Sequence, residues 1–195
     1  WRDDVTVMPD IAEEIARIVS YDNIAPTIPV AILSSGGMTP KKALTKDVTH
    51  YLAHAGLSQI ITFSFMHKDG LTNMMLPEGD NRYTAIPILN PISEEFPYMR
   101  TTLVPAVIEA AKRNIAQQNK DLWLFETANV YEPKALPLTE VPHERPMACG
   151  IMMGKVTEAA WNQAQRDTDF YDVKGVVDGL LAKLGLTQYD IQPSS

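Results

Sequence analysis

Four acidic residues near the start of the sequence have the type and spacing that a metal ion requires. Asp10, Glu13 and Glu14 fall in the first turn of a predicted helix, where side chains three and four residues apart share one side. Asp4 lies on the extended segment before this turn and can fold back towards it. Oxygen ligands suit hard cations, and Mg2+ in particular keeps several waters and accepts few protein ligands. These four residues are therefore candidate magnesium ligands.

The same acidic turn has an electrostatic explanation that needs no metal. Negative side chains are favoured at a helix N-terminus because the helix dipole is positive there, each by about 0.3–1 kcal/mol. Pro9 and Asp10 also suit the first positions of a helix. Judged from spacing alone, this second explanation is the stronger one.

The cysteine and the histidines give weaker signals. Cys149 is the only cysteine and lies in an apolar run, which is typical of a small buried residue rather than a nucleophile. His50 and His54 are four residues apart on a predicted helix, a spacing that can bind zinc. No third ligand is evident, so we interpret them as solvated surface residues.

Arg100 is the one candidate for an electrostatic role towards a substrate. It lies close in sequence to Glu94 and Glu95, and a local ion pair that orders a loop is the more common arrangement. The glycines show no spacing typical of a phosphate-binding loop. We therefore predict no catalytic residue and no nucleotide site in this chain.

The charge of the chain argues against an extensive nucleic-acid interface. The formal net charge is -7, and the basic residues are scattered along the sequence rather than gathered into a stripe. Trp123 and Phe125 alternate with Leu122 and Leu124, which resembles a platform for stacking bases, but a strand buried on both faces explains this pattern more simply. Any role in RNA binding is expected to be indirect.

Hydrophobic periodicity indicates which elements position these residues. Helices are predicted at residues 9–20, 39–55, 101–118 and 170–184. Strands are predicted at residues 58–66, 84–89, 122–131, 147–154 and 188–192, with a proline-containing loop at 132–146. Short strands separated by long helices favour an α+β fold with a largely antiparallel sheet.

The chain divides into two predicted parts. A segment with prolines and two adjacent glycines follows the first helix, and we place a domain boundary near Gly36. Residues 1–36 are then the end of a small domain and a linker, and residues 37–195 form the main domain. Both ends of the sequence look cut. No apolar run is long enough to cross a membrane, so we expect a cytoplasmic protein.

Several motifs, in this order, resemble the β subunit of bacterial phenylalanyl-tRNA synthetase. They are WRDDVT at 1–6, DIAEEIARI at 10–18, YDNI at 21–24, NPISEE at 90–95, MRTTLVP at 99–105, LFE at 124–126 and FYDVKG at 170–175. The resemblance implies a class II aminoacyl-tRNA synthetase-like core, with an antiparallel sheet flanked by helices, truncated at its C-terminus. A short helical remnant of the preceding small domain comes before this core.

The resemblance also implies partners and cofactors. The family assembles as an (αβ)2 heterotetramer in which the α subunit binds ATP and is catalytic, and tRNA(Phe) is bound by the whole enzyme. Asp4, Asp10, Glu13 and Glu14 match the family's magnesium site at the contact with the α subunit. In the fragment alone, we expect weak or empty binding, because ligands are missing and carboxylates repel one another.

The resemblance further implies that this module is not the catalyst. Class II sites hold ATP phosphates with an arginine, whose planar fork meets phosphate oxygens in pairs. When Val130 and Tyr131 are laid over the similar Val-Tyr-Arg stretch of the catalytic subunit, Glu132 takes the position of the arginine. Asn129 stands where related β subunits often have arginine. A strand with an anion and no cation is a poor site for a triphosphate.

Three functions remain to be compared. The first is a non-catalytic structural module that supports the α subunit and leaves an apolar face exposed on the helix at 39–55 or on the strands beside it. The second is a free-standing class II synthetase-like ATP-dependent ligase, which the residue at position 132 disfavours. The third is a nucleic-acid-binding module, which the acidic charge disfavours.

Overall fold

The computed structural model describes residues 2–32, 36–157 and 160–192. The chain separates into two compact units, Trp1–Gly37 and Met38–Ser195. The domain boundary near Gly36 remains a prediction. The two units are described separately below.

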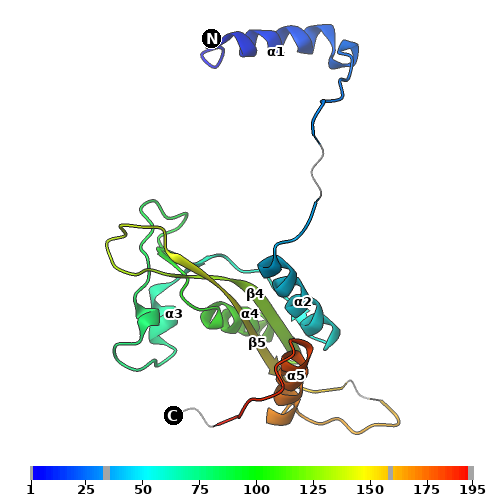
Figure 1. The fold of residues 1–195 in the computed structure, drawn as a ribbon, viewed down its shortest axis with the longest axis vertical. Helices are drawn as coiled ribbons and strands as arrows, with labels where there is room; N and C mark the ends of the chain where they lie inside the picture. Colours follow the sequence, from blue (N-terminus) through cyan, green and yellow to red (C-terminus); the bar gives the residue numbers. More distant parts are fainter. Residues whose placement is uncertain (1, 33–35, 158–159, 193–195) are drawn as a thin grey trace. The chain divides into compact units, whose positions relative to one another are not determined.

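The first unit contains one long helix. Helix α1 spans Met8–Val19 and is followed by the 3-10 turn η1 at Tyr21–Asn23, shown in blue in Figure 1. The predicted helix at residues 9–20 is therefore confirmed. Its apolar side chains, spaced three and four residues apart, are open to solvent, and Ile18 is 83% exposed.

The second unit is built on a three-stranded mixed sheet. Strand β4 (Leu122–Glu132) is central and pairs antiparallel with β5 (His143–Met153) along its full length. Strand β1 (Ser58–Gln59) pairs with β4 on its other side and runs parallel to it. A separate antiparallel pair joins β2 (Phe65–Met66) to β3 (Tyr98–Met99). Strand β5 has a neighbour on one side only in the sheet as described.

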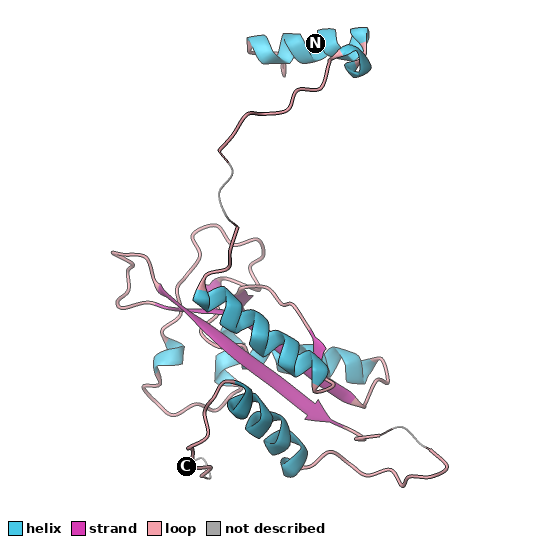
Figure 2. Ribbon diagram, turned by 45° about the vertical axis from the view of Figure 1, so that its right-hand side comes forward, coloured by secondary structure: helices cyan, strands magenta, loops and turns pink. Residues whose placement is uncertain are grey.

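Helices cover both faces of this sheet (Figure 2). Helices α2 (Pro40–His54) and α5 (Phe170–Lys183) pack on one face, and α4 (Val104–Ala116) packs on the other. Two short helices, α3 (Lys68–Thr72) and η2 (Asn81–Tyr83), lie between the predicted strands at 58–66 and 84–89, where no helix was predicted. The predicted helices at 39–55, 101–118 and 170–184 are confirmed within a few residues.

The core consists of two clusters separated by β4. Phe125 packs with Leu52 and Leu57 on the α2 side, while Leu122 and Leu124 pack with α4 on the opposite side. This arrangement follows from the strand period of two, which sends neighbouring side chains to opposite faces. The prediction that β4 is buried on both faces, rather than forming a stacking platform, agrees with these positions.

Several predicted strands differ from the structure. The strand at 58–66 is split because Thr62 donates its backbone N–H to the side chain of Glu126, at 3.2 Å, instead of to a ladder carbonyl. The segment 84–89 forms only an isolated bridge at Pro87, and proline lacks the N–H that a ladder requires. The segment 188–192 is not a strand, and Tyr189 is held by a hydrogen bond to Asp178.

Strand β5 begins earlier than predicted. It starts at His143 rather than Met147 and contains Pro146, which sequence patterns place in loops. Proline is tolerated in an edge strand where its missing N–H faces away from the neighbouring strand. The fold is therefore α+β as predicted, but the sheet is mixed because β1 runs parallel to β4.

Candidate functional site

Asp10, one of the four predicted metal ligands, stabilises the start of α1. Its Oδ2 accepts hydrogen bonds from the backbone N–H groups of Val7 (2.9 Å) and Thr6 (2.8 Å). These bonds, with that of Val7 contributing most, hold the pKa of the Asp10 carboxyl below its usual range. The electrostatic explanation of the acidic turn thus applies to Asp10, whose carboxylate already has two donors.

Arg2 brings Asp4 and Glu14 together. Its Nη2 donates to Asp4 Oδ2 at 2.8 Å and to Glu14 Oε1 at 2.7 Å, and its Nε donates to Asp4 Oδ1 at 2.9 Å. Glu14 also accepts a hydrogen bond from Arg17. The hydrogen bonds from Arg2 lower the pKa of both carboxyls and raise the pKa of the guanidinium. Two of the predicted ligands therefore share one positive charge.

The donor set fits a hard cation in part. Asp4 and Glu14 converge on the Arg2 guanidinium, which stands where a cation would stand, whereas Asp10 turns to the backbone and Glu13 is exposed. Among the described residues, no three acidic, histidine or cysteine side chains gather as a metal-binding group. The sequence did not single out Arg2 or Arg17, although both lie within three residues of a predicted ligand.

Glu132, which takes the position of the catalytic subunit's arginine, has its negative charge balanced by a neighbouring cation. Glu132 accepts a hydrogen bond from Arg145 Nε at 2.8 Å, and His143 Nδ1 lies 3.5 Å from its other oxygen. Arg145, followed by His143, lowers the pKa of the Glu132 carboxyl. Strand β4 itself carries no lysine or arginine, as predicted, but β5 supplies the cation that sequence reasoning missed. The register of the hairpin, which the sequence does not display, brings the two together.

Arg100 forms a buried ion pair, and its predicted pairing with Glu94 or Glu95 is wrong. Its Nη1 donates to Glu126 Oε1 at 3.0 Å, and the two residues are 4% and 2% exposed. Glu94 and Glu95 are exposed on the loop instead. Arg100 lies next to β3, whose pairing with β2 carries its side chain over the sheet, so the partner comes from β4 rather than from the neighbouring loop.

The remaining hydrogen bonds of this pair join three segments. Arg100 Nε donates to the Asn129 carbonyl at 2.9 Å, and its Nη1 lies 3.2 Å from the Phe63 carbonyl. Glu126 accepts a hydrogen bond from the hydroxyl of Thr62 at 2.7 Å. A buried arginine with this many internal acceptors has no free face for a phosphate group, so it holds the sheet together.

The histidines and the cysteine take ordinary positions. His50 and His54 lie on the exposed side of α2, with ring centroids 6.4 Å apart, consistent with surface residues. Cys149 is half-buried in β5, and burial, followed by the nearby charge of Glu126, raises the pKa of its thiol. A raised pKa disfavours the reactive thiolate at neutral pH.

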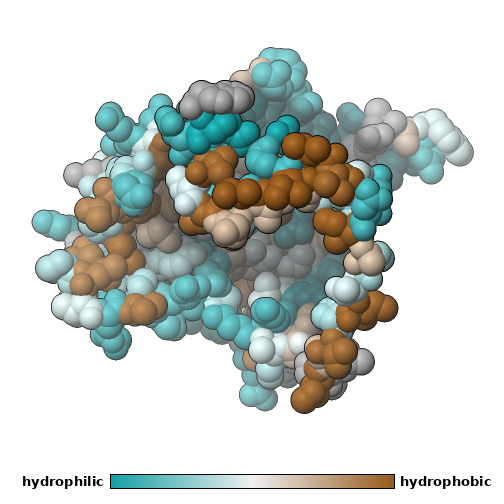
Figure 3. Space-filling view, turned by 90° about the horizontal axis from the view of Figure 1, so that it is seen from above, coloured by the Kyte–Doolittle hydropathy of each residue, from teal (hydrophilic) through white to brown (hydrophobic). Residues whose placement is uncertain are grey.

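Exposed hydrophobic side chains lie on several elements (Figure 3). On α2 itself, the large side chain that is open to solvent is that of Leu44, at 51%. Beyond β1, Ile61 and Phe63 are 89% and 71% exposed. The apolar face expected on the helix is thus small, and the larger exposed apolar surface lies on the segment beside it. Such surfaces are typical of protein–protein contacts.

Comparison with solved structures identifies the fold class. A pyrrolysyl-tRNA synthetase from Desulfitobacterium hafniense aligns with 96% of this chain and 56% of its own, at a TM-score of 0.57 and 13% identity. A histidine–tRNA ligase subunit from Alicyclobacillus acidocaldarius aligns with 83% of this chain and 44% of its own, at a TM-score of 0.55 and 15% identity. The fold is that of a class II aminoacyl-tRNA synthetase-like core.

Sequence comparison is more specific. Residues 24–195 match the family model of the phenylalanyl tRNA synthetase beta chain CLM domain, and the chain belongs to this family. The phenylalanine–tRNA ligase beta subunit of Halalkalibacterium halodurans is 34% identical over 96% of this chain, and that of Staphylococcus aureus is 38% identical over 95%. The chain spans 23% and 22% of the length of these two relatives. No helix in the described residues is long and apolar enough to cross a membrane.

Proposed function

We propose that this chain is a non-catalytic module of a phenylalanyl-tRNA synthetase β subunit. In the whole cytoplasmic enzyme, an (αβ)2 heterotetramer, it supports the α subunit, which binds ATP and attaches phenylalanine to tRNA(Phe). The observation that supports this proposal is the family match, together with the fact that the two arginines near the sheet are paired with glutamates. Arg100 is neutralised by Glu126 and Arg145 by Glu132, so neither is available to a triphosphate.

Binding of the α subunit is the direct test. Titration of α subunit into the chain, followed by light scattering or calorimetry, is expected to give a stoichiometric complex. The exposed side chains of Ile61 and Phe63 provide a matched perturbation, since their replacement by serine removes apolar surface without touching the core. A wild-type chain that stays unbound in the presence of α subunit refutes the proposal.

We further propose that Asp4, Asp10, Glu13 and Glu14 contribute to a Mg2+ site shared with the α subunit. Carboxylate oxygens supply the hard ligands that Mg2+ prefers, and the bound ion would screen the repulsion between these acids at the subunit contact. In the chain alone, the Arg2 guanidinium competes for Asp4 and Glu14.

Replacement of Arg2 by glutamine tests this competition. Magnesium binding, measured by calorimetry with and without α subunit, is expected to strengthen in the variant, because two carboxylates lose their internal cation. Arg166→Gln is a suitable control, since Arg166 pairs with Asp172 far along the sequence and should leave magnesium binding unchanged. Weaker binding in the Arg2 variant than in the wild-type chain counts against the shared site.

The competing function is a free-standing ATP-dependent ligase of the class II type. It requires an arginine at the sheet that is free to hold a triphosphate, and Arg100 and Arg145 are both engaged in ion pairs. Phenylalanine-dependent exchange of pyrophosphate into ATP by the chain alone, above the level of a no-enzyme control, would establish this function instead.

A further inference from the structure

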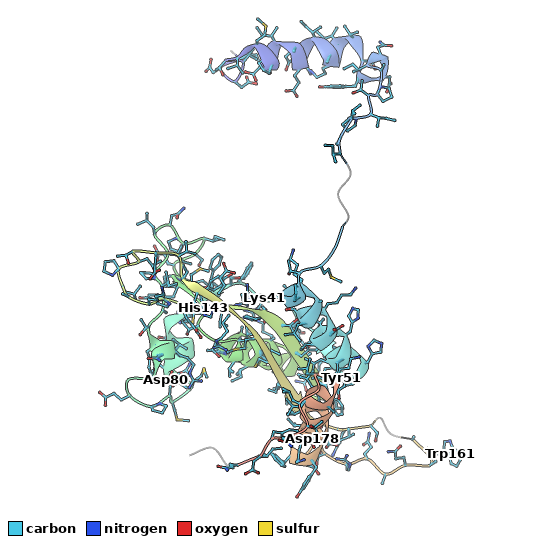
Figure 4. All side chains as sticks on the ribbon, viewed as in Figure 1. Lys41, Tyr51, Asp80, His143, Trp161 and Asp178 are labelled. Carbon is cyan, nitrogen blue, oxygen red and sulfur yellow. The ribbon has the colours of Figure 1, made fainter. Side chains whose placement is uncertain are left out.

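A shallow, open groove lies along α2 beside Asn129 of β4 in the second unit. It has a volume of about 490 Å3 and is lined by lysine, threonine, histidine and asparagine side chains. Asn129 of β4 forms part of the lining, and Lys41, labelled in Figure 4, lies at the end of α2 nearest to this part of the sheet. Apart from the imidazole of His50, no aromatic ring contributes to the lining.

Three of the lining residues, Lys41, Lys42 and Lys46, concentrate positive charge in a chain whose net charge is -7. Lys42, Lys46 and His50 are spaced four residues apart, so they form one stripe along the helix, with successive side chains about 6 Å apart along its axis. Along the sequence, the basic residues as a whole are scattered. Helix α2 places Lys42 and Lys46, together with His50, along one side of the groove.

In the described part of the chain, the groove lysines, like Lys120 and Lys183, form no ion pair with a carboxylate, whereas four other lysines do. Elsewhere, the lysines in ion pairs with carboxylates are Lys112, Lys134, Lys155 and Lys174. In the described part of the chain, Lys41 donates to the backbone carbonyl of Glu144 at 3.2 Å, and no carboxylate lies within 4 Å of the ammonium groups of the three groove lysines.

The acidic residues nearest to the groove do not cancel this charge. The carboxylate of Glu144 accepts a hydrogen bond from the side-chain amide of Asn129, at 2.8 Å, and Asp47 follows Lys46 on α2 without lining the groove. Like charges four residues apart weaken a helix slightly, so the pairing of Lys42 with Lys46 on one side of α2 is unfavourable until an anion binds.

The composition of the groove distinguishes a phosphate backbone from a protein surface. Lysine is depleted in the cores of protein–protein interfaces, which favour aromatic side chains, methionine and arginine. Lysine, threonine and asparagine are, in contrast, common donors to phosphate oxygens in nucleic-acid complexes. Because the lining offers no ring suited to stacking beyond one imidazole, recognition of bases is not expected.

We propose that Lys41, Lys42 and Lys46 form a local, sequence-independent contact with the phosphate backbone of an RNA strand. This inference rests on the proposed function, which makes tRNA the RNA that the assembled enzyme encounters. The contact is small: three lysines neutralise at most about three phosphates, and the acidic remainder of the chain confines the RNA to this groove.

The salt dependence of tRNA binding tests the proposal. Binding of a tRNA(Phe) transcript to the 195-residue chain is measured by fluorescence anisotropy between about 50 and 200 mM salt, the range over which phosphate contacts weaken strongly. Each lysine–phosphate contact contributes about 0.7 to 0.9 to the slope of log K against log salt, the lower value for single strands and the higher for duplex DNA. The variant K41Q/K42Q/K46Q is therefore expected to lower that slope by about 2 to 3.

A charge-matched control separates the groove from the net charge. K112Q/K120Q/K183Q removes the same number of charges from exposed positions outside the groove and is expected to change the slope by less than about 1. Circular dichroism checks that both variants keep their helices, since glutamine and lysine have similar helix propensities. Equal slopes in the two triple variants overturn the proposal.

Capture of the α subunit by the same variants distinguishes this inference from the proposed function. If K41Q/K42Q/K46Q no longer captures the α subunit while the salt dependence of its tRNA binding equals that of the wild-type chain, the groove lysines form a protein interface and the proposal is overturned. If the wild-type chain fails to bind α subunit but the groove variant still lowers the RNA slope, the proposed function fails and the groove assignment stands.

Discussion

Replacing Glu126 by alanine is expected to leave the Arg100 guanidinium charged and buried without a counter-charge. The two side chains are 2% and 5% exposed, and the Nη1–Oε1 distance is 3.0 Å. Solvent therefore contributes little screening to this pair. After the substitution, the guanidinium keeps its hydrogen bonds to the carbonyls of Phe63 and Asn129. The carboxylate that neutralises it is lost.

The expected loss of unfolding free energy is large. Removing one partner of a buried ion pair destabilises proteins by about 3–5 kcal/mol. With a urea dependence of about 1–3 kcal/mol/M, a loss of this size moves the unfolding midpoint by roughly 2 M. The double variant R100M/E126L removes both charges and should lose less than Glu126→Ala, since apolar replacement of a whole pair is often neutral.

Urea unfolding followed by circular dichroism and tryptophan fluorescence provides the assay. Glu132→Ala is the matched control, because it is the same substitution in the same strand, and its pair with Arg145 is 42% exposed on both sides. Exposed pairs contribute about 0–1 kcal/mol, so this variant should stay close to wild type. If the Glu126 variant is no less stable than the Glu132 variant, the reasoning about burial is refuted.

Three further changes test other features. Gly179→Ala should destabilise the chain by about 1–3 kcal/mol through overpacking, because the new Cβ would overlap the Tyr51 hydroxyl and force the ring to move. Gly175→Ala on the same helix meets no atom within 4 Å, so it should be neutral or stabilising in thermal unfolding. The lowered pKa of Asp10 stabilises α1 above its unfolded pKa of about 4, so helix content should fall as the pH drops through the lower folded pKa. Asp10→Asn should reduce this pH dependence, and the part that remains should come from Glu14, whose pKa is also lowered. The raised pKa of Cys149 predicts that iodoacetamide reacts more slowly with the folded chain than with the urea-unfolded chain at pH 8; equal rates would contradict the assignment.

The helices were predictable because their information is local. The apolar spacing in α1, α2, α4 and α5 and signals such as Thr39-Pro40 lie within each segment, so no distant residue is needed to place them. The charge role of Asp10 at the start of α1 was likewise visible from its position. What the sequence did not display is how the carboxylates divide between a backbone cap and an arginine.

The pairings between distant segments were not predictable in the same way. Arg100 and Glu126 are 26 residues apart, and nothing near either residue marks the other as its partner. The sequence instead led to a predicted ion pair between Arg100 and its acidic neighbours Glu94 and Glu95, because local ion pairs are the common case. The parallel pairing of β1 with β4 and the lysine groove also depend on tertiary packing, since α2 must lie along the sheet before its polar side and Asn129 line a groove.

In the described sheet, one side of β5 is unpaired. An open edge carries unpaired main-chain donors and acceptors and acts as a template for another strand. Pro146 removes one donor from this row, so annealing by a foreign strand is restricted to the stretch after it. In solution, the chain by itself is therefore expected to accept an added strand along β5 mainly at residues 147–153.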